Sequence, residues 1–120
     1  MPTSYRIDSH AGVVFIVFEG RITNEEIMHH QRRLSADPDF RSTMNRVIDL
    51  RGVTDPAVTA FGVRTVATQR NFASRCAIIA GDTASSDAYV RMFQTLRSQL
   101  GEDIKIFSTV EDAHRWLGLE

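Results

Sequence analysis

Residues 46–62 read RVIDLRGVTDPAVTAFG, a short apolar run followed by a glycine-containing loop and the start of an amphipathic segment. The run at 47–50 is too short and too β-branched for a helix, and it predicts a buried strand. Thr54 or Asp55 can cap a helix that follows, and Pro56, with its φ already fixed, suits the first helical position. The stretch therefore predicts a helix N-terminus at the carboxyl end of a central strand, where ligands and partners usually meet an open α/β sheet.

Other segments have the composition of strands. Apolar runs occur at 13–18, 76–80 and 104–107, and the first of them is apolar at every position, so both of its faces should be covered. Residues 5–10 alternate between polar and apolar side chains and end at a tight turn, Ala11-Gly12. They predict an edge strand that forms a hairpin with the 13–18 strand.

Capping residues and apolar periodicity predict four helices. They begin at Thr23, at Pro56, in the polar stretch 83–87 and at Thr109. The first has a capping box in which Thr23 pairs with Glu26, and the second extends to Asn71. The third is the clearest, because apolar residues recur at helical spacing through 89–100 and Gly101 suits the left-handed position after it.

The resulting order of elements is β-β-α-β-α-β-α-β-α. Alternating strands and helices after an initial hairpin specify an α/β fold, with a single mostly parallel mixed sheet, right-handed crossovers and one antiparallel edge strand. A chain of 120 residues, 42% of them hydrophobic, suits a single domain over residues 1–120.

Composition narrows the range of partners. A net charge of −1 gives no electrostatic basis for binding nucleic acid or an anionic membrane surface. No apolar run approaches the roughly 20 residues needed to span a bilayer, and the N-terminal residues lack the features of a signal peptide. The single cysteine, Cys76, excludes an intramolecular disulfide and fits a reducing compartment. We therefore predict a cytoplasmic protein with no nucleic-acid partner and no membrane span.

The motifs that identify common enzyme classes are missing from the sequence. It contains no GxGxxG, GxxxxGK[ST] or GxSxG pattern. His29 and His30 are adjacent, so on a helix they point about 100° apart and cannot chelate one ion together. Cys76 lies in an apolar run and is interpreted as a small hydrophobic residue rather than a nucleophile. These observations predict a protein that is not an enzyme and that has no metal and no cofactor.

Asp49, at the end of the predicted central strand, allows two interpretations. A phosphoryl-accepting aspartate, as in a response-regulator receiver, is one of them. The chain begins with a hairpin, however, and it lacks the acidic pair that closes the first strand of a receiver. An aspartate that caps the following turn is the interpretation favoured by this pattern.

Three stretches and the hairpin start carry a resemblance to a known family. The stretches are VIDLRGV at 47–53, AIIAGD at 77–82 and IKIFSTVEDAHRWLGL at 104–119. Together they resemble the STAS family, in particular its SpoIIAA-like branch of small stand-alone proteins. In the anti-sigma-factor antagonists of that family, a partner kinase phosphorylates a serine of an Asp-Ser-Ser-Gly motif at a helix start. By this resemblance, the four motif positions fall on residues 57–60 of this sequence, and only Thr59 among them has a hydroxyl.

Two functions follow from the resemblance and the predicted fold. The first is a non-enzymatic regulatory domain that binds a protein partner, such as a kinase or an anti-sigma-like regulator, through the helix after the central strand. Arg51, Thr54, Asp55 and Thr59 are the candidate residues at the centre of that surface, with Thr54 and Thr59 as candidate phosphoacceptors. The alternative is a carrier of a small molecule or lipid, with a groove between that helix, the 89–100 helix and the sheet. An enzyme of unrecognised mechanism ranks last.

A second candidate site is an anion-binding loop at Thr83, Ser85 and Ser86, before the third predicted helix. Helix capping is the alternative role for these hydroxyls. A homodimer is also compatible with the sequence.

Overall fold

The predicted element order is the order observed in the computed structural model, which describes residues 2–69, 75–80 and 84–119, with the side chains of all of these except 84–87. The strands are β1 (Thr3–Asp8), β2 (Val13–Thr23), β3 (Asn45–Ala57), β4 (Arg75–Ile79) and β5 (Asp103–Phe107). The helices are α1 (Asn24–Ala36), α2 (Ala60–Ala67), α3 (Ala84–Gln99) and α4 (Val110–Leu117).

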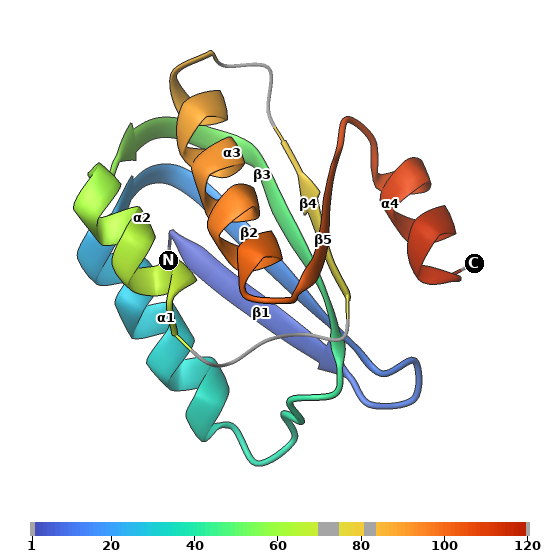
Figure 1. The fold of residues 1–120 in the computed structure, drawn as a ribbon. Helices are drawn as coiled ribbons and strands as arrows, with labels where there is room; N and C mark the ends of the chain where they lie inside the picture. Colours follow the sequence, from blue (N-terminus) through green and yellow to red (C-terminus); the bar gives the residue numbers. More distant parts are fainter. Residues whose placement is uncertain (1, 70–74, 81–83, 120) are drawn as a thin grey trace.

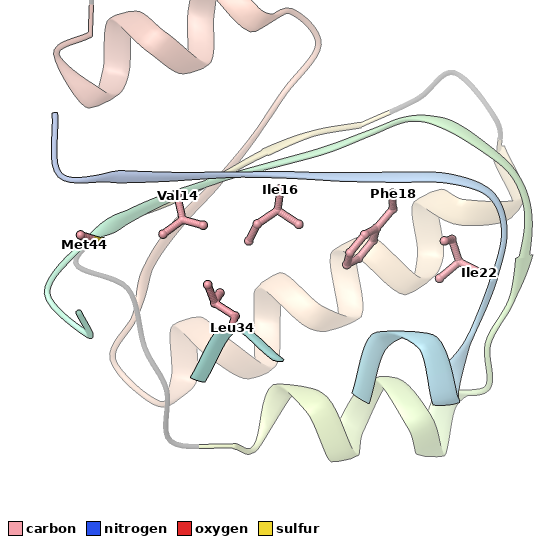
Figure 2. Close-up of a cluster of buried hydrophobic side chains, with 6 residues drawn as sticks. All are labelled: Val14, Ile16, Phe18, Ile22, Leu34 and Met44. Carbon is pink, nitrogen blue, oxygen red and sulfur yellow. The ribbon is translucent and has the colours of Figure 1, made fainter. Parts of the chain in front are cut away.

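The five strands form one mixed sheet in the order β1-β2-β3-β4-β5. β1 and β2 are antiparallel, as the hairpin predicted, and every other neighbouring pair is parallel. Each parallel strand is added beside the previous one in the same direction, so right-handed crossovers place α1, α2 and α3 on one face of the sheet. α4 follows the last strand and lies on the opposite face (Figures 1 and 2).

Both faces of the central strands are buried. On the side of the three helices, Val14, Ile16 and Phe18 of β2 point toward Leu34 of α1 (Figure 2). On the other side, four strand residues pack against Ala113 of α4: Val13, Val47, Ala77 and Ile79. Successive residues of a strand alternate between faces, so covering on both sides explains the uninterrupted apolar run at 13–18.

β3 is longer than predicted, and this corrects the start of the following helix. Pro56 lies in β3 opposite Ile22, rather than at a first helical position. α2 begins at Ala60, and its cap is Thr59, rather than Thr54 or Asp55. The physical reason is pairing with the extended end of β2. β4 pairs with β3 only as far as Asp49, so Pro56 is paired on one side, and its missing N–H leaves no gap in a ladder.

The carboxyl ends of β2 and β3 curl over the helices. Two register shifts, between Val17 and Glu19 and between Gly20 and Arg21, give β3 extra residues relative to β2. Such bulges bend a strand and increase its twist. In Figure 2 the paired ends turn toward α1 and α2 and carry Ile22 with them. The curl closes one end of the space between the sheet and the three helices.

The helix ends follow their predicted signals elsewhere. The capping box is present: the Glu26 N–H donates to the Thr23 hydroxyl at 3.2 Å, and the Thr23 N–H donates to the Glu26 carboxylate at 3.0 Å. Thr109 caps α4. Gly101, after α3, has a φ of +99°. The second helix was predicted to reach Asn71, but α2 ends at Ala67, and Asn71 lies outside the described residues.

A buried ion pair, which was not predicted from the sequence, holds the end of α3. Arg97 donates to the two carboxylate oxygens of Glu102 at 3.0 and 2.9 Å, and both side chains are almost fully buried. The same guanidinium donates to the backbone carbonyl of Gln69 at 2.9 Å. Arg97 therefore connects α3, the start of β5 and the segment that follows α2.

Loss of this arginine should destabilise the protein strongly. We expect Arg97→Met to lower the free energy of unfolding by about 3–5 kcal/mol, because a buried carboxylate loses its bidentate partner. The double variant Arg97→Met with Glu102→Leu should lose less than the single variant. Arg115→Met is the control, since its pair with Asp112 is exposed and should contribute under about 1 kcal/mol. Urea denaturation of the variants measures each value, and a cost for Arg97→Met no larger than the control's contradicts the assignment.

Candidate functional site

The structure places Arg51 in a local ion pair. Its Nε and Nη2 donate to the Asp49 carboxylate at 3.0 and 2.8 Å. The Arg51 backbone N–H also donates to Asp49. Asp49 was predicted to end the strand and cap a turn, but pairing with β2 continues β3 to Ala57, so this contact lies within the strand. The hydrogen bond from the Arg51 side chain is the main reason that the pKa of Asp49 is lowered. The guanidinium of Arg51 is therefore paired with a carboxylate of its own strand, β3.

The other three candidates of the predicted partner surface lie apart. Thr54 is exposed on β3, and Asp55 lies 3.9 Å from Arg21 in an exposed pair. Thr59 is the cap of α2. Within the described part of the chain, no hydrogen bond or ion pair joins any two of Arg51, Thr54, Asp55 and Thr59. The structure thus brings these residues to the same end of the sheet without assembling them into one cluster.

Thr59 instead takes part in a contact between two helix N-termini. Its hydroxyl accepts the Gly62 N–H at 3.0 Å and the Asn24 side-chain amide N–H at 3.1 Å. The amide oxygen of Asn24 accepts the Thr59 N–H at 3.3 Å. A Cβ atom at Gly62 would collide with the Asn24 amide, so glycine is required for this approach. The starts of α1 and α2 are fastened together at this point.

The predicted anion-binding loop falls largely outside the structure. Thr83 lies outside the described residues. Ser85 and Ser86 belong to the first turn of α3, and their side chains are outside the described set. The prediction for these three residues therefore stays a prediction.

No group of three or more His, Cys, Asp or Glu side chains in the described ranges is placed to hold a metal ion. None of the helices in those ranges combines the length and apolar character needed to cross a membrane.

A pocket of about 140 Å³ lies between the sheet and helices α1, α2 and α3, and we call it the helix-side pocket. It overlaps the predicted groove between α2, α3 and the sheet, and it extends to α1. The sheet contributes six apolar side chains: Ile16, Phe18, Ile48, Leu50, Cys76 and Ile78. The curled ends and the following turn add Ile22, Val53, Pro56 and Val58, and the helices add Ile27, Leu34, Val63, Val66, Val90 and Phe93. The wall is therefore mainly apolar.

A few polar side chains interrupt this wall, and His30 of α1 is the most unusual. It is only 4% exposed, and its ring makes edge contacts with Phe18 and Tyr5 at centroid distances of 5.4 and 5.8 Å. Its Nδ1 has no hydrogen-bond partner among the described residues. Burial, with the charges of Arg46 and Arg33 as further causes, lowers the pKa of His30 to about 4. The imidazole is therefore neutral at physiological pH.

Arg46 and Cys76 lie side by side on neighbouring strands of the same wall. Arg46 is 6% exposed, its guanidinium lies 5.4 Å from the centre of the Phe40 ring, and burial lowers its pKa. Burial, followed by the charge of Glu102, raises the pKa of Cys76 to about 12. The thiol is thus protonated at physiological pH, in agreement with its interpretation as a small hydrophobic residue.

The sequence carried a signal for one of these polar residues. His30 shares a helical stripe with Ile27 and Leu34, three residues after the first and four before the second. Such a stripe predicts an inward-facing side chain. No local signal identifies Arg46, because its place in the pocket depends on the pairing of β3 with β4.

Comparisons with known proteins support the fold. No family model and no curated protein matches the sequence. The structure is similar to the crystal structure of an uncharacterised DUF3478-family protein with a SpoIIAA-like fold from Shewanella loihica PV-4. The TM-score is 0.63 at 17% sequence identity, over 96% of this chain and 93% of the other. The chain therefore has the SpoIIAA-like fold that the resemblance implied.

His30 should make folding stability depend on pH. The unfolded chain takes up a proton on this side chain near pH 6.5, and the folded protein does so near pH 4. The unfolded state binds more protons between these values, so the free energy of unfolding should fall as the pH falls through this window, by up to about 3 kcal/mol.

Urea denaturation at pH 7 and pH 4.5 checks this expectation. His30→Phe should lose less stability between the two pH values than the unmodified protein. His10→Phe, which changes an exposed histidine in the turn after β1, should behave like the unmodified protein. An identical pH dependence in both variants would show that His30 is not the group responsible.

Proposed function

We propose that this protein is a non-enzymatic binding protein for a small, mainly apolar molecule held in the helix-side pocket. The observation that carries the proposal is the pocket itself, about 140 Å³ of space with a mainly apolar wall in a chain of 120 residues. An apolar cavity of about 150 Å³ is large enough to hold benzene. Small-molecule sites typically combine such a wall with a few placed polar groups.

The energetics of packing support a ligand in this space. Protein interiors are normally packed as densely as organic crystals. At about 24 cal/mol per Å³, an unfilled volume of this size would cost on the order of 3 kcal/mol of stability. A bound apolar molecule restores those contacts and offsets the cost.

The chemistry of the wall supports binding over catalysis. Cys76 is protonated and buried, so it is a poor nucleophile. His30 makes no hydrogen bond to a hydroxyl or thiol within the described part of the chain, so it is not arranged as the base of a nucleophile pair.

A protein partner at the start of α2 is the second candidate function, and one observation favours it. Phe61 is 79% exposed. Large aromatic side chains exposed on a protein surface often mark a contact with a partner. Phe61 lies two residues after Thr59. Thr59 is the residue with a hydroxyl among the four positions that resemble the Asp-Ser-Ser-Gly motif of anti-sigma-factor antagonists. A kinase or anti-sigma-like regulator would meet this exposed turn.

Binding of a simple apolar probe tests the first proposal. We expect benzene, at about ten times its Kd, to raise the Tm by about 5 °C, because a ligand that binds only the folded state stabilises it. Val66→Phe, which fills the helix-side pocket, should abolish this shift. Val17→Phe is the matched control, since Val17 does not line the pocket, and it should keep the shift.

Native mass spectrometry of freshly purified protein would add an independent observation of a retained small molecule. Absence of a benzene shift in the unmodified protein, or an equal shift in Val66→Phe, would contradict the proposal.

A further inference from the structure

We propose that the ligand of the helix-side pocket is a medium-chain monocarboxylate, with its carboxylate bound at His30 and Arg46 and its alkyl chain along β3 toward Pro56. This inference rests on the proposed function and adds the chemical class of the ligand.

Arg46 marks one end of the pocket. Arg46 is the second residue of β3, and Val53 and Pro56 lie near its opposite end. With a rise of about 3.3 Å per residue, Arg46 and Val53 are roughly 20 Å apart along the strand. Arg46, Val53 and Pro56 all line the pocket, so the space is elongated along β3. An extended chain fits such a shape better than a compact ring system does.

His30 is a polar group without a protein partner at this wall. It is more than nine-tenths buried, and its Nδ1 makes no hydrogen bond to any described residue. Buried polar groups are normally hydrogen-bonded, because leaving one unsatisfied costs about 1–3 kcal/mol. A ligand oxygen at the imidazole would remove that cost.

The charges around His30 select an anion over a neutral or cationic group. The charges of Arg46 on β3 and of Arg33 and His29 on α1 lower the pKa of His30. Glu102 also lines the pocket and acts on Arg46, but its carboxylate accepts two hydrogen bonds from Arg97. Tyr5 of β1 also contacts the ring, and its hydroxyl donates to Asp37 at 2.7 Å. The nearest charges are thus cationic, and they disfavour a proton on His30 while the site is empty. A carboxylate reverses this balance and allows the imidazole to become a charged donor.

Arg46 supplies the second contact. A guanidinium has five N–H donors in a planar fork that matches a carboxylate, so it can bind a ligand beside the contacts that it already makes. Its burial at 6% exposure keeps this interaction away from competing water. His30 and Arg46 together provide a charge-assisted site on the otherwise mainly apolar wall of the helix-side pocket.

Isothermal titration at pH 6.5 with octanoate and with 1-octanol tests the inference. We expect the unmodified protein to bind octanoate about tenfold or more tighter than octanol, because the carboxylate adds charge-assisted hydrogen bonds. His30→Phe and Arg46→Met should reduce octanoate affinity to the level of octanol. Octanol affinity should change little in both variants. The matched controls, His10→Phe and Arg32→Met, change exposed residues of the turn after β1 and of α1 and should bind octanoate normally.

A second readout does not depend on whether the Arg46 variant folds. Saturation with octanoate should raise the pKa of His30 by at least about one unit, whereas saturation with octanol should not. An NMR titration of the His30 ring measures this pKa. Octanol binding as tight as octanoate binding, with no change in the titration of His30, would overturn the inference and leave the proposed apolar site standing. Failure of octanoate, octanol and benzene alike would overturn both.

Discussion

The handedness of the crossovers is the constraint on which the arrangement of this protein depends. After the hairpin, every new parallel strand is added on the same side of its predecessor, from β2 through β5. A right-handed connection then has to pass over the same face each time, so α1, α2 and α3 share that face. The other face is left to α4. This asymmetry explains why one face of the sheet is covered by a single helix, whereas the other face has the helix-side pocket between the sheet and three helices.

The bulged ends of β2 and β3 complete that space. Three helices laid over a flat sheet would leave their N-terminal ends open at the sheet edge. Because β3 carries extra residues opposite β2, the paired strands bend toward α1 and α2 and bring Ile22 and Pro56 over the apolar interior. α2 consequently has two environments: Val63 and Val66 face the pocket, and Phe61 faces solvent. The two candidate functions therefore meet on one short helix.

The element order was predictable from the sequence because its signals are local. The capping box at Thr23, the cap at Thr109 and the apolar stripe of α3 each depend on residues within a turn or two of one another. The end of β3 was not predictable, since its continuation to Ala57 depends on pairing with the distant end of β2. The same limit applies to the candidate site. His30 was visible as part of a helical stripe, whereas Arg46 and the Arg97–Glu102 pair acquire their roles only through contacts across the fold.

The contact between Asn24 and Gly62 has a consequence for how this sequence can diverge. The amide of Asn24 occupies the volume that any side chain at position 62 would need, and it also holds Thr59. A side chain at position 62 therefore requires that Asn24 move or be replaced. In a lineage that carries this arrangement, a larger residue at 62 requires a smaller one at 24. Such linked replacement, far apart in the chain, would trace the joining of the two helix starts through relatives too distant to align by overall identity.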